Sequence, residues 1–118
     1  MARLSIRIDF LPDGRLGPGK IALLERIAEH GSIAAAGRSM GMSYRRAWEL
    51  AAETSALLGA PVIVAKTGGR HGGKATLTPL GDEVVRRYRA AESEAARAAA
   101  RHLDALQQAA DKARKPAG

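Results

Sequence analysis

The sequence predicts a mainly α-helical fold with an N-terminal strand, a small β-hairpin and a long C-terminal helix. Alanine makes up much of the 46% hydrophobic content and aromatic residues only 3%, which favours a small core built from thin helices. Apolar residues recur at helical spacing, and a glycine-rich segment at 68–74 separates two short β-branched runs. With 118 residues, the chain has room for one domain plus an extension.

The N-terminal part of the chain is predicted to form a strand, a turn and a helix. Apolar and polar residues alternate from Leu4 to Phe10, which is the pattern of a strand with one buried face. A Pro-Asp-Gly turn at 12–14 would end this strand. An apolar stripe over 21–28 follows between Pro18 and Gly31, which are typical of a helix start and a helix C-cap.

Two serines predict where the next two helices begin. Ser32 is a suitable N-cap for a short second helix, and Ser43 is a suitable N-cap for a third helix over 44–58. The β-branched runs 62–65 and 76–78 then predict a hairpin around the glycine-rich segment.

The last helix is predicted to begin at Thr78-Pro79 and to continue to about Asp111. We therefore expect a domain over 1–81, a C-terminal dimerisation helix over 79–111 and a disordered basic tail over 112–118.

Residues 32–50 match the requirements of a helix-turn-helix. Such a motif needs small residues where its two helices cross, a turn residue that tolerates positive φ, and apolar residues that lock the helices together. Ala36 and Gly37 are small at the crossing, and Gly41 would lie in the turn. The apolar lock consists of Met40, Met42, Ala47 and Leu50. Together with the hairpin behind it, this motif predicts a winged helix-turn-helix.

The second helix of such a motif enters the major groove of DNA, where residues at its N-terminus reach bases or phosphates. An arginine there can pair with guanine, and a serine at a helix N-terminus can hold a phosphate. Trp48 is interpreted as a core or helix-packing residue and not as a base-stacking residue. The alternative is a solvated helix face with ordinary arginines. The candidate DNA-binding residues of the motif are Ser32, Ser43, Tyr44, Arg45, Arg46 and Glu49.

The glycine-rich segment is predicted to be the loop of a basic wing. Its glycines suit tight turning, and the cations around them favour contact with the phosphate backbone or the minor groove beside the recognition helix. A flexible surface loop with incidental charge is the alternative. The candidate DNA-binding residues of the wing are Lys66, Thr67, Arg70, His71 and Lys74.

The formal net charge of +7 favours an anionic partner, either nucleic acid or an acidic membrane surface. Residues 1–78 contain eleven basic and six acidic residues, against eight and six in 79–118, so the excess lies with the candidate recognition elements. The sequence contains no cysteine, no signal-peptide pattern and no apolar run long enough to span a bilayer. We therefore expect a cytoplasmic protein with no membrane partner.

No catalytic, metal or cofactor site is predicted. His30, His71 and His102 are not at metal-ligand spacing from one another or from carboxylates. Two segments approach the pattern of a phosphate-binding loop, but Ala75 and Ile21 stand where that loop needs a Ser or Thr hydroxyl. We therefore expect neither an enzyme nor a nucleotide cofactor.

These motifs resemble the N-terminal DNA-binding domain of the molybdate-responsive regulator (ModE) family, a relative of the LysR-type winged helices. The matching segments are Leu23–Ala36, Gly41–Trp48, Thr67–Gly73 and Leu77–Gly81, within a resemblance that runs from about Leu4 to Tyr88. The resemblance implies a winged helix-turn-helix, a homodimer joined partly through the terminal helix, and DNA contacts from residues 43–46 and 67–74.

Full-length members of that family continue into β-barrel domains that bind molybdate or tungstate. This sequence ends instead in an alanine-rich helix and a basic tail. We therefore expect a regulator without molybdate-binding domains, and the sequence does not identify a small-molecule effector.

Residues of the final helix repeat with 4-3-4-3-4-4 spacing, close to a heptad seam that would pair two copies of the chain. Because an alanine-rich seam is weak alone, we expect it to act together with the N-terminal strand or the first helix. A solvated helix in a monomer is the alternative. The expected dimerisation residues are Val84, Tyr88, Ala91, Ala95, Ala98, His102 and Leu106.

The sequence thus predicts a homodimeric, sequence-specific transcription regulator that binds a palindromic site on double-stranded DNA. Two alternatives stay open. The first is a non-specific architectural DNA-binding module or a protein-interaction module. The second is an oxyanion-responsive regulator that senses its ligand at the dimer interface.

Overall fold

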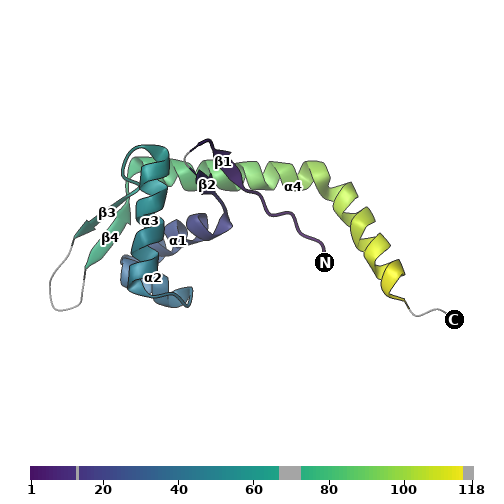
Figure 1. The fold of residues 1–118 in the computed structure, drawn as a ribbon, viewed down its shortest axis with the longest axis horizontal. Helices are drawn as coiled ribbons and strands as arrows, with labels where there is room; N and C mark the ends of the chain where they lie inside the picture. Colours follow the sequence, from purple (N-terminus) through teal and green to yellow (C-terminus); the bar gives the residue numbers. More distant parts are fainter. Residues whose placement is uncertain (13, 67–72, 116–118) are drawn as a thin grey trace.

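The computed structural model describes residues 1–12, 14–66 and 73–115 and confirms the predicted mainly α-helical fold with a winged helix-turn-helix and a long last helix (Figure 1). The elements, in chain order, are β1 (Ile8–Phe10), β2 (Gly14–Leu16), α1 (Pro18–His30), α2 (Ile33–Ser39), α3 (Tyr44–Leu58), β3 (Ile63–Lys66), β4 (Lys74–Leu77) and α4 (Pro79–Arg114). Two antiparallel pairs, β1 with β2 and β3 with β4, form separate small sheets.

Side-chain caps fix the starts of three helices where the sequence predicts them. The Ser32 hydroxyl accepts a hydrogen bond from the Ala35 amide at 3.0 Å, and the Ser43 hydroxyl accepts one from the Arg46 amide at 3.1 Å. Thr78 caps α4 in the same way, since its hydroxyl accepts from the Gly81 amide at 3.1 Å. Each cap stabilises its helix by about 1 kcal/mol because it satisfies a backbone donor that has no partner within the helix.

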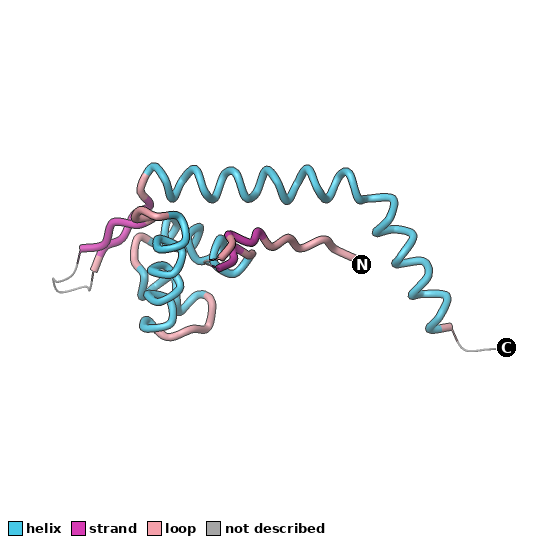
Figure 2. The backbone as a smooth tube through the Cα atoms, turned by 45° about the horizontal axis from the view of Figure 1, so that its top comes forward, coloured by secondary structure: helices cyan, strands magenta, loops and turns pink. Residues whose placement is uncertain are grey.

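The N-terminal strand is shorter than its alternating pattern predicts. Only Ile8–Phe10 pairs with another strand, and its partner β2 was not predicted. The residues before Ile8 run extended beside α4 without a strand partner among the described residues (Figure 2). The alternation of burial nevertheless persists in this segment: Leu4 and Ile6 are half-buried, Ser5 and Arg7 are exposed, and Ile6 packs against the core. The amphipathic pattern therefore reflects contact with the core and not a longer sheet.

Helix α1 lies between two hydrophobic clusters. The first joins α1 to the helix-turn-helix and contains Leu23, Ile27, Ile33, Ala36, Ala47, Ala51 and Ala75. The second joins α1 to α4 and contains Leu16, Ile21, Leu24, Val62, Val84 and Tyr88. Because α1 contributes to both clusters, it fixes the helix-turn-helix relative to α4.

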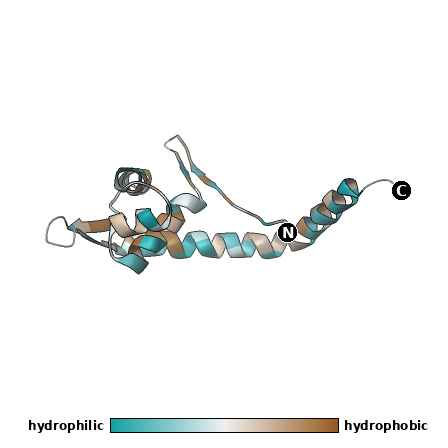
Figure 3. Ribbon diagram, turned by 90° about the horizontal axis from the view of Figure 1, so that it is seen from below, coloured by the Kyte–Doolittle hydropathy of each residue, from teal (hydrophilic) through white to brown (hydrophobic). Residues whose placement is uncertain are grey.

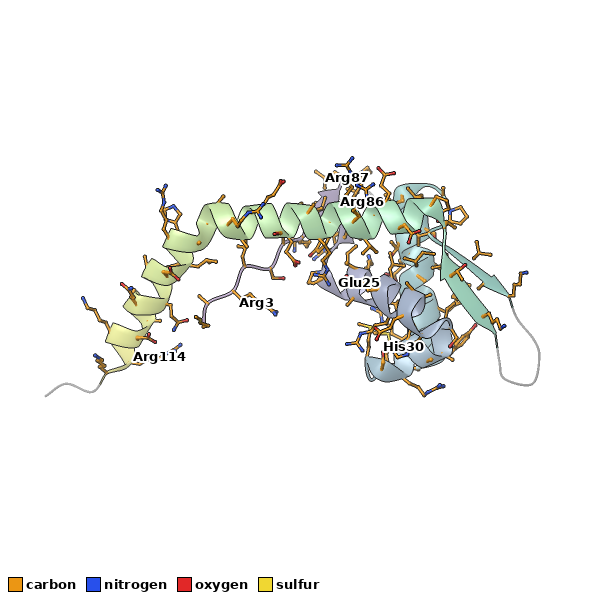
Figure 4. The ribbon with its side chains drawn as sticks, turned by 180° about the vertical axis from the view of Figure 1, so that it is seen from behind. Arg3, Glu25, His30, Arg86, Arg87 and Arg114 are labelled. Atoms are coloured by element: carbon orange, nitrogen blue, oxygen red, sulfur yellow. The ribbon has the colours of Figure 1, made fainter. Side chains whose placement is uncertain are left out.

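Polar contacts strengthen the junction of α1 and α4. Arg89 of α4 donates two hydrogen bonds to Glu25 of α1, at 2.7 and 3.1 Å, and a third to Glu92 at 2.8 Å. The hydrogen bond to Glu25 is the main reason that the pKa of Arg89 is raised. Figure 4 shows Glu25 on the α1 side of α4, with Arg86 and Arg87 on the outer side. The bidentate contact therefore clamps the two helices together.

Two of the residues expected to pair two copies of the chain lie in its own core. Val84 is 8% exposed and Tyr88 is 1% exposed. The Tyr88 hydroxyl donates a hydrogen bond to the Ile6 carbonyl at 2.6 Å, and burial is the main cause of its raised pKa. The predicted pairing seam is therefore wrong at Val84 and Tyr88, because side chains that are buried within one chain cannot contact a second copy.

Helix α4 extends well beyond the packed part of the molecule. The whole molecule measures 66 × 29 × 24 Å. Hydrophilic and hydrophobic residues alternate along α4 (Figure 3). It ends at Arg114, beyond the predicted limit at Asp111, and places Lys112 and Arg114 in its last turn. Positive charge is favourable there because it faces the negative end of the helix dipole. Residues 116–118 of the expected tail lie outside the described residues.

No helix in the described part of the chain combines the length and apolarity needed to cross a membrane.

Replacing Gly81 with alanine should destabilise the fold. A Cβ at this position would collide with the backbone oxygen of Val62, which is completely buried. We expect a loss of about 1–3 kcal/mol in the free energy of unfolding, measured by urea denaturation. Gly19→Ala is the control, because a Cβ at Gly19 meets no described atom within 4 Å. Equal stability of the two variants would contradict the close packing of α4 on Val62.

Replacing Tyr88 with phenylalanine should release the N-terminal segment from α4. The variant loses the hydrogen bond to the Ile6 carbonyl, which stabilises the fold by about 0.5–1.5 kcal/mol. We expect faster trypsin cleavage after Arg7 at unchanged helix content. Tyr44→Phe is the control, since Tyr44 is exposed. Identical cleavage of the two variants would show that this hydrogen bond does not hold the segment.

Candidate nucleic-acid interface

The crossing of α2 and α3 has the close packing that the sequence predicts. A Cβ at Gly37 would lie 3.1 Å from the Cβ of Ala47 and 3.3 Å from the backbone oxygen of Met42. Gly41 has φ of +69°, a conformation that L side chains rarely adopt. The Met42 amide donates to the Gly37 carbonyl at 2.9 Å, which closes the turn. A larger residue at position 37 would force the two helices apart.

The predicted apolar lock is also present. Ala47 is completely buried in the first hydrophobic cluster, and Met40, Met42 and Leu50 pack against that cluster. These contacts determine which face of α3 is buried. The buried residues of α3 are Ala47, Ala51 and Thr54, and the opposite face of the helix is open to solvent.

The N-terminus of α3 carries the exposed residues predicted to contact DNA. Ser43 caps the helix, and the Tyr44 residue that follows is 53% exposed. The Arg45 side chain is 89% exposed and that of Arg46 is 53% exposed. These residues are therefore accessible to a ligand as large as a duplex.

Both arginines are engaged by carboxylates of the same helix. Arg45 Nε donates to Glu49 Oε1 at 3.2 Å, and Arg46 Nη1 lies 3.7 Å from Glu49 Oε2. Arg46 Nη1 also lies 3.9 Å from Glu53 Oε1, and Glu53 Oε2 lies 3.7 Å from Lys20 Nζ on α1. We call these five residues the α3 charge network. The sequence contains the spacing of Arg45 and Glu49, but the contact of Glu53 with Lys20 exists only because α1 packs on α3.

Trp48 does not pack in the core as expected, because it is 51% exposed. Ala47 and Ala51 occupy the buried face of α3, and Trp48 lies about 100° around the helix from Ala47. It follows Tyr44 by one turn, so the two aromatic side chains share a side of the helix. One feature of the sequence could have indicated this position: Ala47 and Ala51 are small enough to fill the core at the helix crossing, and Trp48 does not lie on their face.

The wing is present as the antiparallel pair of β3 and β4. Lys66 and Lys74 face each other across the last pair of residues in its register, and both are exposed. The predicted wing residues Thr67, Arg70 and His71 lie outside the described residues. Two of the wing cations therefore stand at the open end of the described hairpin.

The wing is attached directly to the helix-turn-helix. Ala75 of β4 is buried in the first cluster, and its amide donates to the Gly31 carbonyl at 2.8 Å. Gly31 lies between α1 and α2, next to Ser32, which caps α2. The wing and the helix-turn-helix thus lie at one end of the molecule, away from the free end of α4 (Figures 1 and 4).

Among residues 1–12, 14–66 and 73–115, no three His, Cys, Asp or Glu side chains are grouped as they would be around a metal ion.

No family model matches the sequence. The chain is 44% identical over 79 residues to the molybdenum-pterin-binding protein MopB of Rhodobacter capsulatus, which covers 67% of this chain and 29% of MopB. It is 37% identical over 94 residues to the molybdenum transport protein ModE of Azotobacter vinelandii, which covers 80% of this chain and 34% of ModE. It is 37% identical over 71 residues to the DNA-binding transcriptional dual regulator ModE of Escherichia coli, which covers 60% of this chain and 27% of that protein.

The matched part of the chain thus spans about a third or less of the length of these relatives. It corresponds to the N-terminal region of ModE, which is the part that the helix-turn-helix and wing motifs resemble. The chain is therefore a homologue of the N-terminal region of ModE, and of the molybdenum-pterin-binding proteins MopA and MopB.

Proposed function

We propose that this chain is a transcription regulator that binds specific sites on double-stranded DNA. The observation that carries the proposal is the exposed N-terminus of α3, where Tyr44, Arg45 and Arg46 follow a serine cap on a rigidly packed helix-turn-helix. The E. coli relative is named as a DNA-binding transcriptional regulator, which supports it. Such a regulator acts in the cytoplasm, where its DNA is, and no catalytic role is proposed.

The chemistry of α3 suits the major groove. Arg45 can donate two hydrogen bonds to the O6 and N7 atoms of a guanine, and Tyr44 can contact a phosphate or a thymine methyl group. The backbone amides at the start of α3 favour a phosphate because they lie at the positive end of the helix dipole. Ser43 would add its hydroxyl proton to that contact, since its oxygen already accepts from Arg46. Ser32 would do the same at the shorter α2.

The wing would contact the phosphate backbone or the minor groove beside α3. Lys66 and Lys74 provide two of its positive charges, and Thr67, Arg70 and His71 of the connecting segment complete the proposed set. Such contacts carry affinity and orientation, whereas base contacts carry specificity.

We further propose that the protein acts as a homodimer joined through α4. The helix has 36 residues and leaves the packed part of the molecule with apolar side chains still accessible. Leu106 is 65% exposed, and pairing with α4 of a second copy would remove its apolar surface from water. The seam would use Ala91, Ala95, Ala98, His102 and Leu106. A two-fold dimer presents two α3 helices, so its DNA site would be palindromic.

Replacing Arg45 with alanine should relax specificity, whereas replacing Lys74 should weaken binding to all duplexes. We expect Arg45→Ala to cost about 1–3 kcal/mol at one base pair of a site selected by the wild-type chain from a random library. Lys74→Ala should lower the slope of log affinity against log salt by about 0.9. Fluorescence anisotropy at several salt concentrations measures both effects.

Arg97→Ala is the control, since it removes one exposed positive charge from the middle of α4, outside the helix-turn-helix and the wing. Equal binding of the wild-type chain to selected and random duplexes would contradict a specific regulator and would favour an architectural module.

Replacing Leu106 with glutamate should separate the proposed dimer, because it places two like charges in the α4 seam. We expect light scattering to give the mass of one chain for this variant and of two chains for wild type. Gln108→Glu is the control, because it adds the same charge about 200° around the helix from Leu106. A wild-type protein with the mass of one chain would contradict the dimer.

A further inference from the structure

Glu49 places a negative charge between the two arginines proposed to contact DNA. One of its oxygens accepts from Arg45 and the other lies beside Arg46, so a single carboxylate engages both cations. Glu53 engages Arg46 from the next turn. In the free protein, the positive charge at the N-terminus of α3 is therefore partly neutralised within its own helix.

These ion pairs are exposed to solvent and are easily exchanged for other partners. The side chains of Arg45 and Glu49 are 89% and 41% exposed, and ion pairs in such surroundings contribute little to stability. An approaching duplex can thus break them. A phosphate that draws Arg45 away leaves the Glu49 carboxylate without this partner, one helical turn from the DNA backbone, where like charges repel.

A specific site can compensate for this loss in a way that a random duplex does not. The amino group of a cytosine donates to a carboxylate in the major groove, as the O6 and N7 atoms of guanine accept from an arginine. A site with a cytosine within reach of Glu49 and a guanine within reach of Arg45 gives each side chain a new partner. A phosphate contact gives a partner to the arginine alone.

We propose that Glu49 is a specificity-determining residue that suppresses binding to random duplexes by holding Arg45 and Arg46, and that accepts a hydrogen bond from cytosine at the specific site. The proposal rests on the proposed function. This role differs from that of an ion pair that only stabilises its helix. Such a pair is available for comparison on α4. Glu83 and Arg87 have the same spacing, in the opposite order, on the exposed side of the first turns of α4, with 3.9 Å between their charged atoms.

The test compares Glu49→Gln with Glu83→Gln, because each substitution removes one negative charge from an exposed ion pair. Affinities are measured by fluorescence anisotropy for two duplexes of equal length and composition, the site selected by the wild-type chain and its scrambled form. For Glu49→Gln we expect affinity for the scrambled duplex to rise about three- to tenfold and the salt slope to steepen by about 0.9, the value for one added phosphate contact. The ratio of the two affinities should fall about tenfold, while Glu83→Gln keeps the wild-type ratio.

A ratio for Glu49→Gln equal to that of Glu83→Gln overturns the proposal. A wild-type chain that binds both duplexes equally overturns the proposed function itself, which distinguishes the two failures. Circular dichroism confirms that both variants keep their helix content.

A double-mutant cycle tests whether Glu49 acts through the arginine. In the Arg45→Ala background, Glu49→Gln should raise affinity for the scrambled duplex by less than half of its effect in the wild-type background, because one of the held cations is gone. An undiminished rise in that background would overturn the role of Glu49 in holding Arg45.

Discussion

The burial of α1 on both of its sides is the constraint on which the rest of the structure depends. Its side chains Leu23 and Ile27 are fully buried against the helix-turn-helix, and Ile21 and Leu24 are fully buried against β2 and α4. Each fully buried aliphatic side chain contributes roughly 1.5–3 kcal/mol, so these four residues link the two clusters strongly. The two hydrogen bonds from Arg89 to Glu25 also fix the orientation of α1 relative to α4. The position of α3, and of any ligand on it, is thereby fixed relative to α4.

The exposed end of α3 carries opposite charges, and this balance bears directly on how it would meet DNA. A bare cluster of cations binds every duplex through its phosphates, with little discrimination. The α3 charge network instead interleaves Glu49 and Glu53 with three cations. Such an arrangement reduces non-specific attraction at some cost in affinity. The exposed Tyr44 and Trp48 lie beside it and offer an apolar edge that phosphate contacts do not use.

The first turns of α4 and its remaining turns have different surroundings. Its first turns complete the core through Gly81, Val84 and Tyr88, and the Tyr88 hydroxyl holds the N-terminal segment. The remaining turns extend away from the core and keep exposed positions such as Leu106. The heptad-like pattern of the sequence runs through both parts, because a buried face within one chain and a pairing face between two chains follow the same helical period.

The sequence by itself determined the positions of the helices, since Ser32, Ser43 and Thr78 act through local hydrogen bonds to amides three residues away. It also determined the turn at Gly41 and the exposed arginines that begin α3. Tertiary structure decided what depends on contacts between distant residues. It placed Trp48 at the surface, buried Val84 and Tyr88 within one chain, paired β1 with the unpredicted β2, and joined Lys20 to Glu53. The physical reason is that helical period and capping are local, whereas the choice of which apolar face is buried depends on how the volumes of all packed side chains fit together.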